Sequence, residues 1–246
     1  ELIDNIKEFC DKQRLNKFIV SLSGGLDSMV LTAILKFLGF RVICLHINYN
    51  NRDESPLEQQ FLEEWCLKED IILYTKVIDT IKRGTIKRST YELESKNIRF
   101  GFYKEILEQE KCTMILLGHH KDDIVENVVA NVCRGRNLLD LAVIKEQTTQ
   151  NNITIARPML EFYKITIYDF ANEYQIPYFK DTTPDWSVRG KYRNNIAPLL
   201  EDAFSKSIKS NLLCLSQQSD EWNQMIFNHI IGPFMETVIF NENVCS

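Results

Sequence analysis

Short apolar runs alternate with longer amphipathic segments through most of the chain. Five runs rich in β-branched and aliphatic residues are typical of buried strands, at residues 17–20, 42–46, 71–75, 113–117 and 153–156. Apolar residues at helical spacing predict helices at residues 29–38, 56–69, 90–110 and 163–174, and another that begins near residue 120. Because strands and helices alternate, the pattern predicts an α/β fold with a mostly parallel sheet and helices on both of its faces.

The regular alternation ends near residue 205. We therefore expect one large domain over residues 1–205 and a short helical C-terminal extension over residues 206–246. The extension is too short to bury a core of its own.

A small-residue turn separates the first predicted strand from the helix that follows it. The turn consists of Ser23, Gly24, Gly25, Leu26, Asp27 and Ser28. Two consecutive glycines let the backbone curl, so that its N–H groups and the positive end of the helix face one point. The serine hydroxyls add donors, and the carboxylate of Asp27 suits a magnesium ion that bridges phosphates. The turn therefore predicts a phosphate-binding site.

Further polar side chains follow the second and fourth predicted strands. His46 ends the second strand, and His119 lies just beyond the fourth. Asp123 and Glu126 follow His119 at helical spacing, so the three side chains are expected to share one face and to point toward the turn at 23–28. Ligands of parallel α/β folds gather at the carboxyl ends of the strands, where all these residues fall.

Composition narrows the class of protein. The net charge of −5 does not by itself indicate a nucleic-acid-binding protein. Seven cysteines are scattered without a Cys-x-x-Cys pair, which argues against a zinc ribbon or a disulfide scaffold and favours reduced thiols in the cytoplasm. No apolar stretch is long enough to span a bilayer, so no membrane partner is expected. The sequence is compatible with a homodimer.

The turn at 23–28 lacks the Gly-Lys-Ser/Thr ending of a Walker A loop. As Ser-Gly-Gly-Leu-Asp-Ser, it resembles the pyrophosphate loop of the ATP pyrophosphatases, which cleave ATP to AMP and pyrophosphate. That resemblance implies a Rossmann-like fold of the adenine nucleotide α-hydrolase type, with ATP and Mg²⁺ as cofactors.

A second resemblance is more specific. The run His119-His120-Lys121-Asp122-Asp123-Ile124-Val125-Glu126 resembles the second motif of the tRNA(Ile)-lysidine synthetases. Further segments resemble that family in the same order along residues 15–200: His46–Tyr49, Glu92–Phe100, Arg134-Gly135, Arg157–Leu160, Tyr178–Asp181 and Arg193–Ile196. The chain departs from the family at Asn127, where threonine is usual, and in the reduced C-terminal part.

The resemblance implies a reaction and roles for residues. ATP adenylates C2 of the wobble cytidine of tRNA(Ile) with a CAU anticodon, and free lysine then displaces AMP to form lysidine. The implied ATP-binding residues are the six of the turn together with His46. The implied catalytic residues are Asp27, which also holds Mg²⁺, with His119, Asp123 and Glu126. The implied contacts to the cytidine and the tRNA come from Arg99, Asp123, Glu126 and Arg193.

Three alternatives stay open at this point. A tRNA cytidine-thiolating enzyme shares the loop but needs cysteines for an iron–sulfur cluster. An amide-forming synthetase shares the loop but lacks the His-His-x-Asp-Asp segment. A degenerate homologue would bind nucleotide or RNA without turnover.

Overall fold

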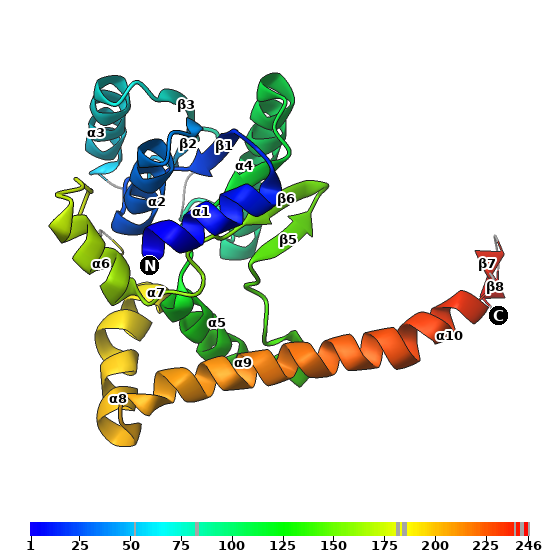
Figure 1. The fold of residues 1–246 in the computed structure, drawn as a ribbon. Helices are drawn as coiled ribbons and strands as arrows, with labels where there is room; N and C mark the ends of the chain where they lie inside the picture. The colour runs from blue at the N-terminus through cyan, green and yellow to red at the C-terminus, as the bar shows by residue number, and fades with distance from the viewer. Residues whose placement is uncertain are drawn as a thin grey trace. The chain divides into compact units, whose positions relative to one another are not determined.

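The computed structural model describes residues 1–51, 53–81, 84–180, 183, 186–238, 240–241 and 244–245. The chain packs as two compact units (Figure 1). Unit 1 comprises Glu1–His120 and Lys145–Thr182, and unit 2 comprises Lys121–Ile144 and Thr183–Ser246. The predicted functional boundary at residue 205 differs from this division by packing, and it stays a prediction.

Unit 1 is built on a six-stranded sheet. Its strands are β1 (Lys17–Ser21), β2 (Arg41–Asn48), β3 (Ile72–Val77), β4 (Met114–Leu116), β5 (Gln147–Gln150) and β6 (Ile153–Ala156). Their order is β3-β2-β1-β4-β6-β5, and every neighbouring pair is parallel except β5 with β6. The mostly parallel sheet predicted from the sequence is confirmed.

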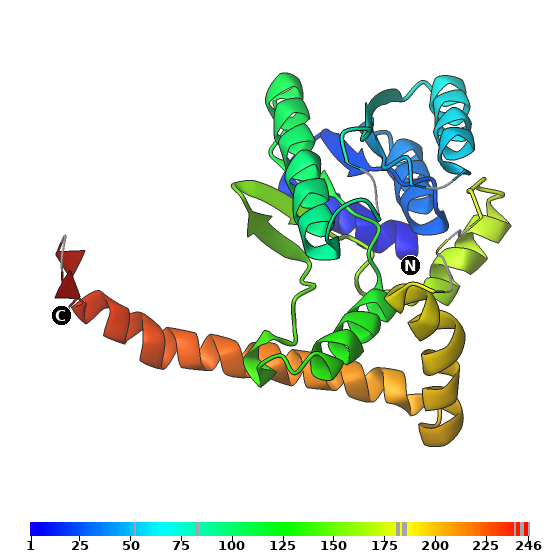
Figure 2. The same cartoon turned by 180° about the vertical axis from the view of Figure 1, so that it is seen from behind.

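Alternate residues of the strands face two separate cores. Phe18 and Val20 of β1 pack with α1 (Leu2–Gln13), α2 (Leu26–Phe37), α3 (Ser55–Lys68) and α6 (Lys164–Glu173). Ile19 points to the other face, which α4 (Arg88–Glu110) covers. Figures 1 and 2 show α4 behind and in front of the sheet respectively. Helices therefore cover both faces, as predicted.

Unit 2 is helical apart from its last residues. Its elements are α5 (Lys121–Cys133), a 3₁₀ turn (Leu138–Asp140), α7 (Val188–Lys191), a π-helical segment (Tyr192–Ile196), α8 (Ala197–Phe204), α9 (Ser207–Ile226), a second π-helical segment (Phe227–Ile231), α10 (Gly232–Thr237), β7 (Phe240–Asn241) and β8 (Val244–Cys245). The Ser219 hydroxyl of α9 donates a hydrogen bond to the carbonyl oxygen of Leu138 at 2.6 Å and accepts one from the amide of Leu141 at 3.3 Å. Ser219 therefore ties the 3₁₀ turn to α9.

Several elements differ from the sequence-based expectation, among them α7, α8 and the π-helical segment between them, none of which was predicted. Helix α2 begins at Leu26 rather than Met29, so Asp27 and Ser28 lie in its first turn. Strand β5 was not predicted, because Gln147–Gln150 has no apolar alternation and forms a mostly exposed edge. Helix α1 was not predicted either, although its buried Leu2, Ile6, Phe9 and Cys10 recur at helical spacing.

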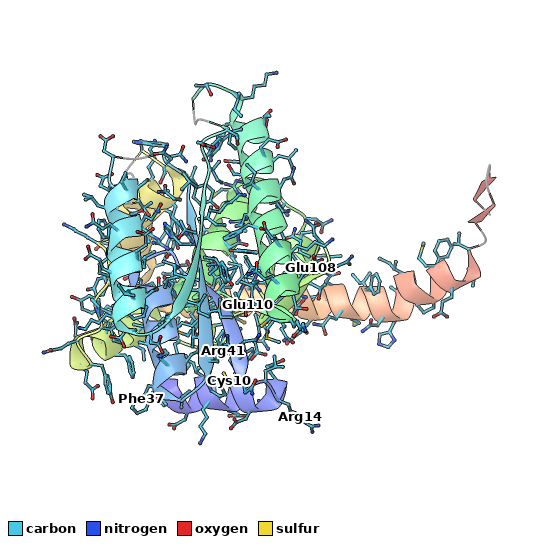
Figure 3. The ribbon with its side chains drawn as sticks, turned by 90° about the horizontal axis from the view of Figure 1, so that it is seen from above. Cys10, Arg14, Phe37, Arg41, Glu108 and Glu110 are labelled. Carbon is cyan, nitrogen blue, oxygen red and sulfur yellow. The ribbon has the colours of Figure 1, made fainter. Side chains whose placement is uncertain are left out.

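One end of the sheet carries an ion pair, and the other end contains the switch point of the strand order. At the end where the strands begin, Glu110 accepts hydrogen bonds from the Tyr74 hydroxyl, at 2.7 Å, and from Lys17, and Arg41 adds a nearby positive charge. Figure 3 labels Arg41 and Glu110. At the carboxyl ends, the chain runs from β1 to β2 on one side and later returns to β4 on the other, which makes the β1–β4 junction the switch point where ligands of such folds bind.

Candidate nucleotide site and carboxylate–arginine cluster

Hydrogen bonds from hydroxyl and amide groups fix the conformation of the loop after β1. Gly24 has a φ of +85°, a conformation that favours glycine, and its carbonyl oxygen accepts a hydrogen bond of 2.8 Å from the amide of Phe179. The Ser28 hydroxyl donates to the carbonyl oxygen of Gly25 at 3.0 Å and accepts from the amide of Ser23 at 3.2 Å. These contacts shape the loop as a cradle at the positive end of α2, which is suited to an anion.

Asp27 lies in the first turn of α2 between two basic groups. Its Oδ1 is 3.6 Å from Nε2 of the buried His120, and its Oδ2 is 3.9 Å from Nζ of Lys164. The carboxylate side chain is one-quarter exposed. Lys164 was missing from the sequence-based site, because nothing in its local sequence links it to the loop.

A magnesium ion fits this donor set. Among the described residues, no group of three or more His, Cys, Asp or Glu is close enough to enclose a metal ion. Mg²⁺ bound with a nucleotide commonly takes one or two carboxylates and completes its shell with phosphate oxygens and water. A single accessible carboxylate beside a phosphate cradle, as Asp27 provides, meets that requirement.

Gly118 is a site residue that the sequence-based list omitted. A Cβ at this position would lie 2.9 Å from the carbonyl carbon of Asp27 and 3.0 Å from the amide nitrogen of Ser28. Only glycine lets the backbone after β4 approach the loop this closely. The available signal was the position of Gly118 between a buried strand and two histidines.

His46 lies near the end of β2, and its imidazole ring is buried and uncharged. Its Nδ1 makes a 3.0 Å hydrogen bond to the carbonyl oxygen of Leu22, so Nδ1 carries the proton. Burial lowers the pKa of His46, which keeps the ring neutral. Among the described residues, nothing donates to Nε2, although that atom is buried. The ring therefore offers an acceptor to a ligand hydroxyl or amino group.

His119 follows β4 and contacts Arg157. Nε of Arg157 donates to Nδ1 of His119 at 3.0 Å. Arg157 is the first residue after β6 and its side chain is buried. The structure thus joins two of the segments that resemble the lysidine synthetases within unit 1.

In unit 2, two carboxylates and two arginines form one cluster. Arg189 donates to Oε1 of Glu126 at 2.7 Å and to Oδ1 of Asp123 at 2.9 Å. Arg193 donates to Oε2 of Glu126 at 2.9 Å and to Oδ1 of Asp123 at 3.3 Å. The four formal charges cancel. We call these four residues the carboxylate–arginine cluster.

Local structure explains the cluster. Asp123 and Glu126 are three residues apart on α5, and Arg189 and Arg193 are four apart across α7 and the π-helical segment that continues it. π-Helical turns are rare and occur frequently at functional sites. The cluster includes Asp123, Glu126 and Arg193 from the predicted site and adds Arg189.

The remaining predicted contact residue, Arg99, lies on α4 in unit 1. Burial raises the pKa of Tyr49, and the nearby positive charge of Arg99 partly offsets that rise. The predicted residues thus fall into two sets: the loop, His46, Arg99 and His119 in unit 1, and Asp123, Glu126 and Arg193 in unit 2. That both sets line one pocket stays a prediction.

Fold and loop together define a nucleotide-binding α/β protein of the pyrophosphate-loop class. The chain belongs to the PP-loop domain family, whose model matches residues 1–200.

Individual relatives narrow the comparison. The chain is 28% identical to the tRNA(Ile)-lysidine synthase of Chlamydia muridarum over 98% of its own length and 76% of the relative's. It is 28% identical to that of Bacteroides thetaiotaomicron and 29% identical to that of Enterococcus faecalis, of which it covers 53% and 40%. The predicted relationship to the tRNA(Ile)-lysidine synthetases, a family of ligases, is confirmed.

Solved structures confirm the predicted fold type. The U34-tRNA thiolase NcsA from Methanococcus maripaludis, solved with its [4Fe-4S] cluster, has a TM-score of 0.68 at 18% identity, with 93% of this chain and 79% of that one covered. An NH3-dependent NAD synthetase from Campylobacter jejuni has a TM-score of 0.52 at 13% identity, with 91% and 92% covered. Among the described residues, no helix is long and apolar enough to cross a membrane.

Proposed function

We propose that this chain is an ATP-dependent tRNA-modifying ligase that forms lysidine. It adenylates C2 of the wobble cytidine in tRNA(Ile) with a CAU anticodon and then joins free lysine to that carbon. The observation that carries the proposal is the pairing, within one chain, of a phosphate cradle with a cluster of carboxylates suited to amines. The names of the relatives supply the substrate class.

In the first step, the cytidine O2 attacks the α-phosphorus of ATP, and the bond from that phosphorus to the bridging oxygen of pyrophosphate breaks. Backbone N–H groups of the loop and the hydroxyls of Ser23 and Ser28 bind the departing pyrophosphate at the positive end of α2. Asp27 would hold Mg²⁺, which neutralises phosphate charge when bound. His46 accepts a hydrogen bond from the nucleoside part of ATP.

In the second step, the amine of lysine attacks C2, and the C2–O bond breaks to release AMP. The attacking ammonium must first lose a proton, and the carboxylates Asp123 and Glu126 are suited to accept it. They also accept from the exocyclic amine of the cytidine, which has to leave its stack to be held by its polar edge. Arg193 and Arg99 contact the base and the phosphates of the tRNA.

The amine has to share the carboxylates with two guanidinium groups. The side chain of Arg189 is 48% exposed and that of Arg193 is 26% exposed, whereas those of Asp123 and Glu126 are 6% and 15% exposed. Arg189 is therefore the arginine that solvent or RNA phosphates reach first. A lysine ammonium takes its place on the carboxylates with little change in the charge of the cluster.

Pyrophosphate release from ATP tests the proposal. We expect release with tRNA(Ile) bearing a CAU anticodon, and a gain of lysine by that tRNA, seen by mass spectrometry, only when lysine is present. Pyrophosphate release with aspartate or xanthylate and no RNA would identify an amide synthetase, and gain of sulfur by the tRNA would identify a thiolase. Release with no transfer to RNA in any combination would indicate a degenerate homologue.

Two variants locate the site. Asp27→Asn and Asp123→Asn should each lower the rate of lysidine formation at least about 100-fold while leaving the chain folded, as circular dichroism would show. Asp169→Asn is the matched control, because Asp169 lies exposed on α6. Full activity of either site variant would mean that the site has been misplaced.

Two further features belong to the proposal. The chain acts in the cytoplasm, where tRNA and ATP are available and its cysteines stay reduced. The sequence is compatible with a homodimer, and light scattering coupled to size-exclusion chromatography would identify one by twice the mass of a 28.8 kDa chain.

A further inference from the structure

Arg157 anchors three neighbouring segments of unit 1. Its Nη1 donates to the carbonyl oxygen of Lys145 at 2.6 Å and to the hydroxyl of Thr148 on β5 at 3.1 Å. Its Nε donates to Nδ1 of His119, which follows β4, at 3.0 Å. Arg157 itself follows β6, so one buried side chain spans the carboxyl end of β4 and the edge strand of the sheet.

The contact with Arg157 decides where His119 carries its proton. A guanidinium group has five N–H donors and no acceptor, and it stays protonated in proteins. In the Arg157–His119 hydrogen bond, the imidazole Nδ1 must therefore present its lone pair. A neutral imidazole with an unprotonated Nδ1 carries its proton on Nε2. Protonation of Nδ1 would remove this acceptor and bring two cations together.

Among the residues that the structure describes, none with a negative charge pairs with Arg157. Every partner of Arg157 among the described residues is neutral: a carbonyl oxygen, a hydroxyl and an imidazole. The residue as a whole is only 8% exposed. Buried charges in proteins are usually paired, because a buried ion without a counter-charge is costly. An unbalanced buried cation beside His119 is suited to an anion bound at the strand ends.

We propose that Arg157 is a positioning residue that holds His119 as a neutral Nε2–H donor for a phosphate oxygen of the nucleotide. The identity of the anion rests on the proposed function, whereas the protonation pattern of His119 does not. In this role His119 stabilises negative charge on the reacting phosphate. It does not serve as a general base, because Arg157 occupies the lone pair that such a base would need.

Nitrogen NMR of the imidazole rings tests the first half of the proposal without any substrate. In the full ¹⁵N-labelled chain, long-range ¹H–¹⁵N spectra distinguish protonated from unprotonated ring nitrogens of the four histidines, and His119→Gln assigns the signals of His119. We expect an unprotonated Nδ1 and a protonated Nε2 on His119. A protonated Nδ1 in the unsubstituted chain overturns the proposal, regardless of the results for the Arg157 variants.

Variants of Arg157 test the cause. Arg157→Met keeps an unbranched stem but removes every donor, and we expect the ring nitrogens of His119 to lose the preference for Nε2 protonation. Arg157→Lys keeps the charge and a donor group at the end of the stem, without the fork geometry of the guanidinium, and should restore that preference in part. If Arg157→Met unfolds the chain, the comparison of Arg157→Lys with the unsubstituted chain still reports a weakened preference. An unchanged pattern in both folded variants overturns the proposal.

ATP binding tests the second half. Calorimetric titration should show about tenfold weaker ATP binding for Arg157→Met, which corresponds to about 1.4 kcal/mol, and a smaller loss for Arg157→Lys. If both variants bind ATP as well as the unsubstituted chain, Arg157 does not act on the nucleotide and the proposal is wrong. If the unsubstituted chain binds no ATP, the proposed function fails, and the NMR pattern still decides the positioning role.

Discussion

Gly118 lies so close to Asp27 that a Cβ on the glycine would be 2.9 Å from the Asp27 carbonyl carbon. The atoms it would meet are backbone atoms of the first turn of α2, which cannot move aside as a flexible side chain can. Gly118→Ala must therefore push the phosphate loop out of position. Overpacking of this kind costs about 1–3 kcal/mol. We expect ATP affinity, measured by calorimetry, to fall at least about tenfold.

Gly101→Ala provides the control for this prediction. Gly101 lies within α4, and a Cβ there would meet no atom within 4 Å. Alanine in a helix interior is more favourable than glycine by about 1 kcal/mol, so this variant should be at least as stable as the unsubstituted chain and bind ATP equally well. Equal ATP affinity of the two alanine variants would contradict a role for the close approach at Gly118.

The buried ring of His46 should make stability depend on pH. Burial lowers the pKa of His46 below its ordinary value of 6.5. As the pH falls through 6.5, the unfolded chain binds a proton that the folded chain does not, so the folded state loses stability by up to about 1.4 kcal/mol per pH unit. The loss ends once the pH passes below the lowered pKa of the folded state. Above pH 6.5 this histidine has no effect on the pH dependence.

His46→Asn tests that expectation. Asparagine keeps a donor for the carbonyl oxygen of Leu22 but does not titrate. Urea unfolding between about pH 7.5 and 5.5 should show a shallower decline of the free energy of unfolding than in the unsubstituted chain. His229→Asn, which changes an exposed histidine, should leave the slope unchanged. A slope that His46→Asn does not alter would show that the ring is not held neutral.

The sequence was sufficient to predict features that depend on local pattern. The strand–loop–helix order around residues 23–28 and the buried strand that contains Phe18, Ile19 and Val20 both follow from the local pattern of apolar and small residues. Strand β5 lacks such a pattern because it is a mostly exposed edge whose pairing with β6 comes from the backbone.

Features that depend on distant partners were not predictable in the same way. Gly118 is critical because the backbone of Asp27, in the loop after the neighbouring strand, comes close to it. The two residues are far apart in the sequence. Arg189 looks like one of several surface cations in a basic stretch, and only its approach to Asp123 and Glu126 gives it a partner. Sequence spacing can propose a helix face, but it does not say what covers that face.

One hydroxyl of α9 helps to hold the 3₁₀ turn of unit 2. Ser219 both donates to and accepts from the backbone of the turn, and its side chain is buried. Ser219→Ala leaves both backbone groups unsatisfied, which should cost about 1–3 kcal/mol in the free energy of unfolding of unit 2. Hydrogen exchange at the Leu141 amide should accelerate accordingly. Ser216→Ala, at a second buried serine of α9, is the control, and equal effects of the two substitutions would contradict this assignment.

Arg189 should limit access of the amine to the carboxylates. Removing its charge by Arg189→Gln leaves two carboxylates and one arginine among the four residues of the cluster, so the formal charge of the cluster becomes negative and attracts an ammonium group. The side chain of Arg189 is half exposed, so solvent screens the gain to about 1 kcal/mol. We expect the KM for lysine to fall about fivefold while the rate of pyrophosphate release at saturating ATP and tRNA changes little. Lys191→Gln removes a charge from the same short helix and is the control. A KM for lysine that rises in Arg189→Gln would instead show that Arg189 helps to bind the substrate.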